Sequence, residues 1–482
     1  MTFNSVEFLI FFPITILLYF VLPKKLSRIS LLIMSAIFYL AWDYRLIVLI
    51  LFTTAVSYFC AIIIERSEKQ SVKKLCIVLT LIACLGVLFF FKYYNFLATS
   101  FGWALKQFGA GEYDFTLNLV LPVGISFYTF QTLSYAIDVY RGTEKAEHDF
   151  LLYSLYVIFF PQLVAGPIER PGNLIPQLRE KNALTSDNVR AGLWKMAVGF
   201  FKKIVVADLI AEYVNAVYNN AQAATGWGVV IASLLFSVQI YCDFSGYTDI
   251  AIGSARVMGI RLIKNFDRPY KSQSIKEFWA RWHISLSSWL KDYLYFPLGG
   301  SRCSGARHMF NLMVVFFASG LWHGANWTFV LWGLLHGVMR VCGELTAPCR
   351  KRLWARLGVN DGNTVLVISR RIVTFALICF SWVFFRANSL GDLSVLLGKL
   401  FTPWGSLSDT LSAMGLSLTA IVTAVLSIIV MVEFDILCEK TDCSDVGCAR
   451  HSSLMWCVWA VAVAWIMLLS VGGASTFIYF QF

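Results

Sequence analysis

The sequence predicts an all-α polytopic membrane protein with about 11–13 transmembrane or re-entrant helices. Of its 482 residues, 58% are hydrophobic and only 14% are charged, whereas an ordinary soluble domain is about one quarter charged. The apolar residues gather in stretches that approach the roughly 20 residues needed to cross a bilayer. The 40 Phe, 20 Tyr and 16 Trp residues are typical of aromatic belts at both membrane interfaces.

Apolar stretches outline the successive membrane segments. They lie at 6–22, 29–42, 46–64, 75–91, 119–139, 151–168, 227–241, 372–386, 411–432 and 454–471. Pro122 and Gly124 interrupt the fifth stretch, and Pro161, Gly166 and Pro167 should break the sixth. A broken helix at membrane depth is tolerated where it lines a cavity or packs within protein, although an interfacial loop explains the sixth stretch equally well.

The distribution of charge predicts the orientation of the chain. Its net charge of +11 is carried by Lys and Arg in short loops, which is the positive-inside pattern and needs no nucleic-acid partner. No positive charge precedes the first stretch, whereas Lys24, Lys25 and Arg28 follow it. We therefore expect an N-terminus outside and no cleavable signal. The alternation of spans places the C-terminus outside as well.

The most informative stretch runs from 273 to 332. In its first half Trp279, Trp282 and Leu286 repeat at helical spacing, which predicts an amphipathic helix in an interface or re-entrant cleft. His283 borders this stripe and could equally anchor the helix at headgroup depth. The more apolar second half carries His323, and an ionisable group at membrane depth is a functional candidate by default. The structural alternative for His323 is a hydrogen bond to a neighbouring helix.

Basic residues on the inner side are candidates for binding a phosphate-rich donor. Lys202 and Lys203 lie in the amphipathic segment 178–208, and Arg281 lies beside His283. Snorkelling at the interface explains the lysines without a ligand, and Asp208 is a candidate surface partner of Lys203.

Two further groups of polar residues receive a structural interpretation. The carboxylates of Asp243 and Asp249 could orient a histidine or bind a cation, but no histidine or third acid lies nearby in the sequence. We therefore predict no metal site. His336 follows His323 by thirteen residues, which places it on roughly the opposite face of an unbroken helix, and we expect it to be structural.

Several blocks carry a family resemblance. They are L-P-V-G-I-S-F-Y-T-F-Q at 121–131, F-F-P-Q-L-V-A-G-P-I-E-R at 159–170, Y-C-D-F-S-G-Y-T-D-I-A-I-G at 241–253, R-W-H-I-S-L-S-S-W-L-K-D-Y-L-Y-F-P-L-G-G at 281–300 and G-L-W-H-G-A-N-W at 320–327. In this order the blocks resemble the membrane-bound O-acyltransferase family, and most closely its bacterial alginate O-acetylase branch. The resemblance covers most of the chain.

The resemblance implies one membrane domain over 1–482, with a core at 119–343 and helices around a central funnel. It places the essential histidine at His323, with His283 in support. It implies acetyl-CoA as donor substrate, no permanently bound cofactor, an envelope polysaccharide as acceptor and an SGNH-type acetyltransferase as extracytoplasmic partner. The expected location is the bacterial cytoplasmic (inner) membrane. An aromatic tail at 474–482 offers Tyr479 as an acyl relay, with an interfacial anchor as the alternative.

Two other functions remain open from the sequence. The first is the D-alanyl transferase of teichoic acid, in which a tail of this kind stands on a separate peptide. Here the tail is fused to the chain, which favours the acetylase branch. The second is a non-enzymatic transporter of envelope glycans, which often shows two matching halves that this sequence lacks. Among acceptors, alginate, peptidoglycan, cellulose and other glycans are all compatible with the sequence.

Overall fold

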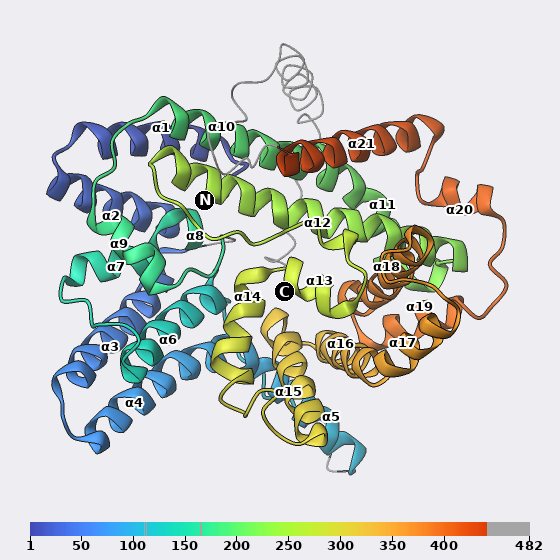
Figure 1. Cartoon of the computed structure of the whole chain (residues 1–482), viewed down its shortest axis with the longest axis horizontal. Helices are drawn as coiled ribbons and strands as arrows, with labels where there is room; N and C mark the ends of the chain where they lie inside the picture. The colour runs from blue at the N-terminus through green and yellow to red at the C-terminus, as the bar shows by residue number, and fades with distance from the viewer. Residues whose placement is uncertain (110, 112, 164–165, 441–482) are drawn as a thin grey trace. The chain divides into compact units, whose positions relative to one another are not determined.

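The computed structural model describes residues 1–440 except for 110, 112, 164 and 165. The described residues form helices joined by turns and extended loops, with no strand among them. They fall into two compact units. The first unit comprises Met1–Ala197 and Tyr247–Ile263, and the second comprises Val198–Gly246 together with the described part of Lys264–Cys443. The all-α architecture predicted from composition is confirmed for this part of the chain (Figure 1).

The first unit contains the helices of the N-terminal half. They are α1 (Val6–Val21), α2 (Lys24–Leu40), η1 (Tyr44–Leu46), α3 (Ile47–Arg66), α4 (Gln70–Leu88), η2 (Phe89–Tyr93), α5 (Tyr94–Gln107), α6 (Ile125–Arg141), α7 (Phe150–Ile158), α8 (Phe160–Leu163), α9 (Pro171–Arg179) and most of α10 (Ser186–Phe200). Helix α1 packs on α2, and α3 packs on both α4 and α6 (Figure 1).

The predicted interruptions are present. Helix α6 starts at Ile125, directly after the Pro122–Gly124 element, where Gly124 has a left-handed backbone. The sixth stretch breaks into α7 and α8. The carbonyl of Tyr156, in the last turn of α7, accepts hydrogen bonds from the side-chain amides of Gln131 (2.7 Å) and Gln162 (2.5 Å). The carbonyl of Tyr156 at this break is therefore satisfied by two buried side chains.

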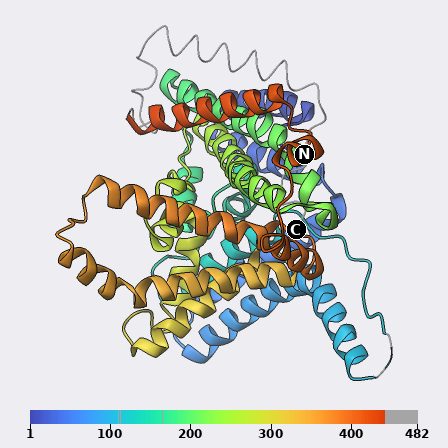
Figure 2. The same ribbon diagram turned by 90° about the vertical axis from the view of Figure 1, so that its right-hand side faces the viewer.

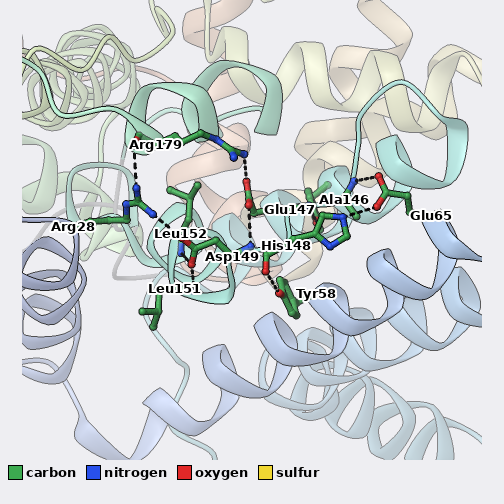
Figure 3. A network of polar contacts seen from close by, with 11 residues as sticks. Arg28, Tyr58, Glu65, Ala146, Glu147, His148, Asp149, Leu151, Leu152 and Arg179 are labelled. Atoms are coloured by element: carbon green, nitrogen blue, oxygen red, sulfur yellow. Dashed lines mark hydrogen bonds and ion pairs between the residues drawn. The ribbon is translucent and has the colours of Figure 1, made fainter. Parts of the chain in front are cut away.

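A polar network fastens the loop that precedes α7 (Figure 3). Its ion pairs and charge-assisted hydrogen bonds join Arg28 to Asp149 (2.6 Å), Arg179 to Glu147, and His148 to Glu65 (2.9 Å). Asp149 also caps α7 by accepting from the backbone N–H groups of Leu151 and Leu152. The network links the start of α7 to α2, α3 and α9, all within the first unit.

The second unit contains most of the remaining helices. They are η3 (Phe201–Ala207), α11 (Asp208–Tyr218), η4 (Ala221–Ala223), α12 (Gly226–Val257, whose last residues belong to the first unit), η5 (Pro269–Lys271), α13 (Ile275–Arg281), α14 (Ile284–Leu290), η6 (Lys291–Tyr295), α15 (Gly305–His323), α16 (Trp327–Leu345), α17 (Ala347–Arg356), α18 (Thr364–Arg386), α19 (Leu390–Lys399), α20 (Leu407–Ala413) and α21 (Leu418–Lys440).

Helices α15 and α16 form a tight antiparallel hairpin, and α16 packs in turn on α18 (Figures 1 and 2). Gly320 and Gly333 face one another where the two helices of the hairpin cross. A Cβ atom on Gly320 would overlap the carbonyl of Phe329, and one on Gly333 would overlap the carbonyl of Phe316. Only glycine permits this approach, because small residues let helix backbones come into direct contact.

Within the described residues, five helices are long and apolar enough to cross a membrane: Tyr44–Arg66, Gln70–Gln107, Gly226–Val257, Thr364–Arg386 and Leu418–Ile436. Each overlaps a predicted span, which confirms a multi-pass membrane protein. The predicted span at 454–471 lies outside the described residues. The expectation of a single domain over 1–482 stays a prediction.

Candidate active site

The predicted amphipathic helix is in fact two short helices that meet at His283. Helix α13 ends at Arg281 and α14 begins at Ile284, because His283 adopts a left-handed backbone with φ of +45°. A side chain other than glycine in this conformation costs about 1–2 kcal/mol, and such strain gathers at functional sites. The prediction of one continuous helix was therefore wrong at this residue. The stripe of Trp279, Trp282 and Leu286 is nonetheless buried, as its periodicity predicted.

The side chain of His283 is fully buried and lies beside His323. The centroids of the two imidazole rings are 6.3 Å apart. Phe244 meets His283 edge-on at 4.8 Å, and Trp322 contacts it at 5.5 Å. The pKa of His283, which lies between two short helices, is lowered to about 3 by burial. Its imidazole is therefore neutral near pH 7.

His323 occupies the last position of α15, where the helix ends at Gly324. Its side chain is buried among aromatic rings that come from the same helix and from two others. The ring centroids of Trp322, Trp332 and Phe385 lie 5.1, 5.0 and 5.5 Å from that of His323. The structure thus brings together the two histidines predicted to act together, in an apolar enclosure contributed by α12, α14, α15, α16 and α18. An enclosure of this kind strengthens electrostatic interactions with a reacting group.

His336 contacts Trp332, one of the aromatic residues that enclose His323. The indole N–H of Trp279 donates to Nδ1 of His336 at 3.2 Å, so Nε2 carries the proton and donates to the hydroxyl of Ser381 at 3.0 Å. The ring of Trp332 lies between His336 and His323, with centroid distances of 4.8 and 5.0 Å. These contacts agree with the structural role predicted for His336.

Lys202 and Lys203 lie in the π-helix η3 and are both buried. Lys203 pairs with Asp208 (2.7 Å) and with Asp243 (2.8 Å), and its side chain is only 1% exposed. A π-helix brings residues i and i+5 onto one face, which explains why Asp208 reaches Lys203. The predicted partner is therefore correct, but the pair is buried rather than on the surface. Lys202 pairs with Asp435 at 2.9 Å.

Arg281 is the most accessible of the three predicted donor-binding residues. Its side chain is 30% exposed and forms ion pairs with Glu277 (3.0 Å) and Asp267 (3.6 Å). Of the two carboxylates considered for a cation, Asp243 neutralises Lys203, and Asp249 pairs with Lys195 at 2.8 Å within the first unit. Tyr479 lies outside the described residues.

One residue of the site was missed from the sequence. Asn265 lies eighteen positions before His283 and its side-chain oxygen is 3.1 Å from Nδ1 of His283. It belongs to a polar stretch, K-N-F-D-R at 264–268, whose composition is ordinary for a loop. No periodicity or spacing in the sequence distinguishes it, because the contact depends on how the loop folds back against α14.

Known proteins share the part of the chain that forms this site. Residues 146–386 match the model of the membrane-bound O-acyltransferase family, a segment that contains both histidines and begins and ends later than the predicted core. The chain is 38% identical over 394 residues to a probable alginate O-acetylase of Pseudomonas aeruginosa, covering 81% of this chain and 73% of the relative. It is 36% identical over 431 residues to the peptidoglycan O-acetyltransferase of Helicobacter pylori, covering 83% and 79%.

A more distant relative is the teichoic acid D-alanyltransferase of Bacillus subtilis, with 29% identity over 286 residues, covering 56% of this chain and 70% of the relative. The matched family segment spans the broken helix, the paired histidines and the α15–α16 hairpin. The chain therefore belongs to the membrane-bound O-acyltransferase family and is a multi-pass membrane acyltransferase.

Proposed function

We propose that this protein transfers an acetyl group from cytoplasmic acetyl-CoA across the membrane, for O-acetylation of an extracytoplasmic polysaccharide of the alginate or peptidoglycan type. The observation that carries the proposal is the pair of buried imidazoles, His323 and His283, inside the matched family segment. The names of the relatives supply the substrate class, since two of them are O-acetylating enzymes of envelope polysaccharides.

The chemistry requires a base in a dry environment. A hydroxyl group is a weak nucleophile at its own pKa, and an adjacent imidazole activates it by accepting its proton. His323 is the proposed general base, because it stands at the end of α15 with aromatic rings on several sides. The oxygen then bonds to the acetyl carbon, the carbon–sulfur bond breaks, and the proton leaves with the coenzyme A thiolate.

The donor's phosphates are proposed to meet the basic residues predicted from the sequence. Arg281 is the first candidate, because part of its side chain is exposed. Lys202 and Lys203 would take part only if their ion pairs with Asp435, Asp208 and Asp243 open. No resident cofactor is needed for this reaction.

The outer half of the pathway is also part of the proposal. The protein is placed in a bacterial cytoplasmic membrane with both termini outside. Tyr479 in the C-terminal tail accepts the acetyl group as a phenyl ester, and an SGNH-type partner passes it to the polysaccharide. The support is the position of an aromatic, uncharged tail with a single hydroxyl in its last six residues.

Substituting His323 by alanine tests the proposed function. The variant should lose at least about 100-fold in acetyl transfer from acetyl-CoA, the lower end for removal of a general base. His148→Ala is a matched control, since His148 lies in the loop before α7 and pairs with Glu65 in the first unit. If the folded His323→Ala protein transfers acetyl groups at the rate of the control, the assignment of His323 is wrong.

D-alanyl transfer is the second candidate, because the similarity to a teichoic acid D-alanyltransferase extends over about half of the chain. The two functions differ in the donor. Purified protein that releases coenzyme A from acetyl-CoA supports the first candidate, whereas turnover only with a D-alanyl thioester supports the second.

A further inference from the structure

Asn265 accepts hydrogen bonds from the residues that directly follow His283. Its backbone carbonyl accepts from the N–H of Ile284 at 2.9 Å. Its side-chain oxygen Oδ1 receives the backbone N–H of Ser285 at 3.2 Å and the hydroxyl of Ser285 at 2.9 Å. The same oxygen lies 3.1 Å from Nδ1 of His283. The three side chains are fully buried, so these contacts do not compete with water.

These contacts determine the proton position on His283. A backbone N–H can only donate, so the atom of Asn265 that faces Ser285 must be its oxygen and not its amide nitrogen. The hydroxyl of Ser285 lies 2.9 Å from Oδ1 of Asn265 and 3.4 Å from Nδ1 of His283, so its proton is directed to the nearer amide oxygen. An amide oxygen can only accept, so Nδ1 of His283, at 3.1 Å from that oxygen, carries a proton of its own. In a neutral imidazole the other nitrogen then holds the lone pair. The basic nitrogen of His283 is therefore Nε2.

We propose that Asn265 is a positioning residue that fixes His283 as the Nδ1–H tautomer and so presents Nε2 as a second proton acceptor beside His323. This extends the supporting role predicted for His283. It rests on the proposed function only for the reaction step, because the tautomer follows from the hydrogen bonds alone.

The surroundings of His283 favour the same arrangement. The left-handed backbone at His283 interrupts the helix, and in this conformation the imidazole ring contacts Asn265. The ring contacts described above come from Phe244 of α12 and from Trp322 and His323 of α15, and His323 is the titratable group among them. The partner at Nδ1 is a neutral amide and not a carboxylate, so it does not hold the ring as a permanent imidazolium.

In the reaction step, the proton of the attacking hydroxyl moves to the histidine pair as the oxygen–carbon bond forms. Nε2 of His283 can hold that proton because Nδ1 is already protonated and hydrogen-bonded to Asn265. The histidine then gives the proton to the coenzyme A sulfur, which leaves as the free thiol when the carbon–sulfur bond breaks. No oxidant, metal or additional reactant is required.

The tautomer can be measured without any turnover. Full-length protein labelled with ¹⁵N-histidine contains six histidines, and comparison with His283→Gln assigns the signals of His283. Solid-state NMR in lipid vesicles should show a protonated Nδ1 and an unprotonated Nε2 for this residue. A protonated Nε2 with a bare Nδ1 would overturn the proposal.

Steady-state kinetics test whether the contact between Asn265 and His283 contributes to acetyl transfer. Asn265→Ala should lower kcat for acetyl transfer on the order of 10-fold to 100-fold, the range for loss of an orienting partner, with KM for acetyl-CoA changed less than about 3-fold. Asn265→Asp keeps the accepting oxygen and adds a charge, which stabilises the imidazolium. Asn265→Asp should therefore be more active at alkaline pH than at neutral pH. The pH at which its activity is lost on the acid side should rise by about 1 unit or more relative to the wild type.

Asn311→Ala is the matched control, because Asn311 is equally buried in the same unit but bonds to the carbonyls of Leu298 and Gly300. Its pH profile should equal that of the wild type. If folded Asn265→Ala and Asn265→Asp both behave like this control, the positioning role is refuted. If the wild type itself transfers no acetyl group, the proposed function fails, while the NMR measurement still decides the tautomer.

Discussion

Replacing Lys203 by methionine should destabilise the second unit severely. Methionine fills a similar volume but removes the charge that lies between Asp208 and Asp243, at 2.7 and 2.8 Å. Burial lowers the pKa of Lys203, but the two carboxylates more than compensate, so its pKa lies above the ordinary value and the side chain stays charged. The variant therefore removes the Lys203 ammonium from both Asp208 and Asp243.

The magnitude follows from burial. The side chain of Asp243 is 3% exposed and that of Asp208 is 13% exposed, so solvent screens neither well. Removing one partner of a buried ion pair costs about 3–5 kcal/mol, because the remaining charge is uncompensated. Lys202→Met should cost less, about 1–2 kcal/mol, since Asp435 is 19% exposed and also accepts from the hydroxyl of Tyr241 at 2.6 Å.

The assay is the thermal denaturation midpoint of purified protein, together with the fraction that elutes as a single species. The expected order is wild type, then Lys202→Met, then Lys203→Met. The double variant Lys203→Met/Asp243→Asn should recover part of the loss, because it removes the more buried carboxylate as well. If Lys203→Met is as stable as the wild type and instead raises KM for acetyl-CoA, Lys203 belongs to the donor site and the structural interpretation is wrong.

Three further predictions concern the site. Arg281→Glu should raise KM for acetyl-CoA at least about 10-fold, because the reversed charge repels the donor's phosphates, and the effect should shrink at high salt; an unchanged KM would remove Arg281 from the donor site. Tyr479→Phe should abolish acetylation of the polysaccharide at normal expression, whereas persistent acetylation would make the tail an anchor only. Since burial lowers the pKa of His283 to about 3 in the folded protein, its contribution to stability is complete above the unfolded pKa of about 6.5 and is lost as pH falls from there toward 3. The thermal midpoint should accordingly drop less on acidification in His283→Gln than in the wild type, and an equal drop in both would contradict this.

Some features predicted from local sequence are also present in the structure. Pro and Gly residues disfavour helix interiors, and the breaks before α6 and between α7 and α8 were predictable from Pro122, Gly124 and Pro161. Pro13 and Pro176 nevertheless lie inside α1 and α9. Apolar stretches predicted the membrane spans for the same reason, because hydropathy and length are properties of a contiguous segment.

Other features were decided by contacts between segments distant in sequence. The amphipathic pattern around His283 has no break in it, yet the helix ends there because Asn265 captures the turn through four hydrogen bonds or close polar contacts. The environment of Lys203 was likewise invisible, since Asp243 stands forty positions later on another helix.

The sequence by itself therefore determined the class of protein and five of its membrane segments, and it named His323 and His283 as candidates. Only the tertiary structure decided that the rings of these histidines lie 6.3 Å apart, that Asn265 contacts Nδ1 of His283, and that Lys203 pairs with carboxylates. The physical reason is that hydropathy and helix breaking depend on adjacent residues, whereas proton position and charge pairing depend on the few groups that packing places within hydrogen-bond distance.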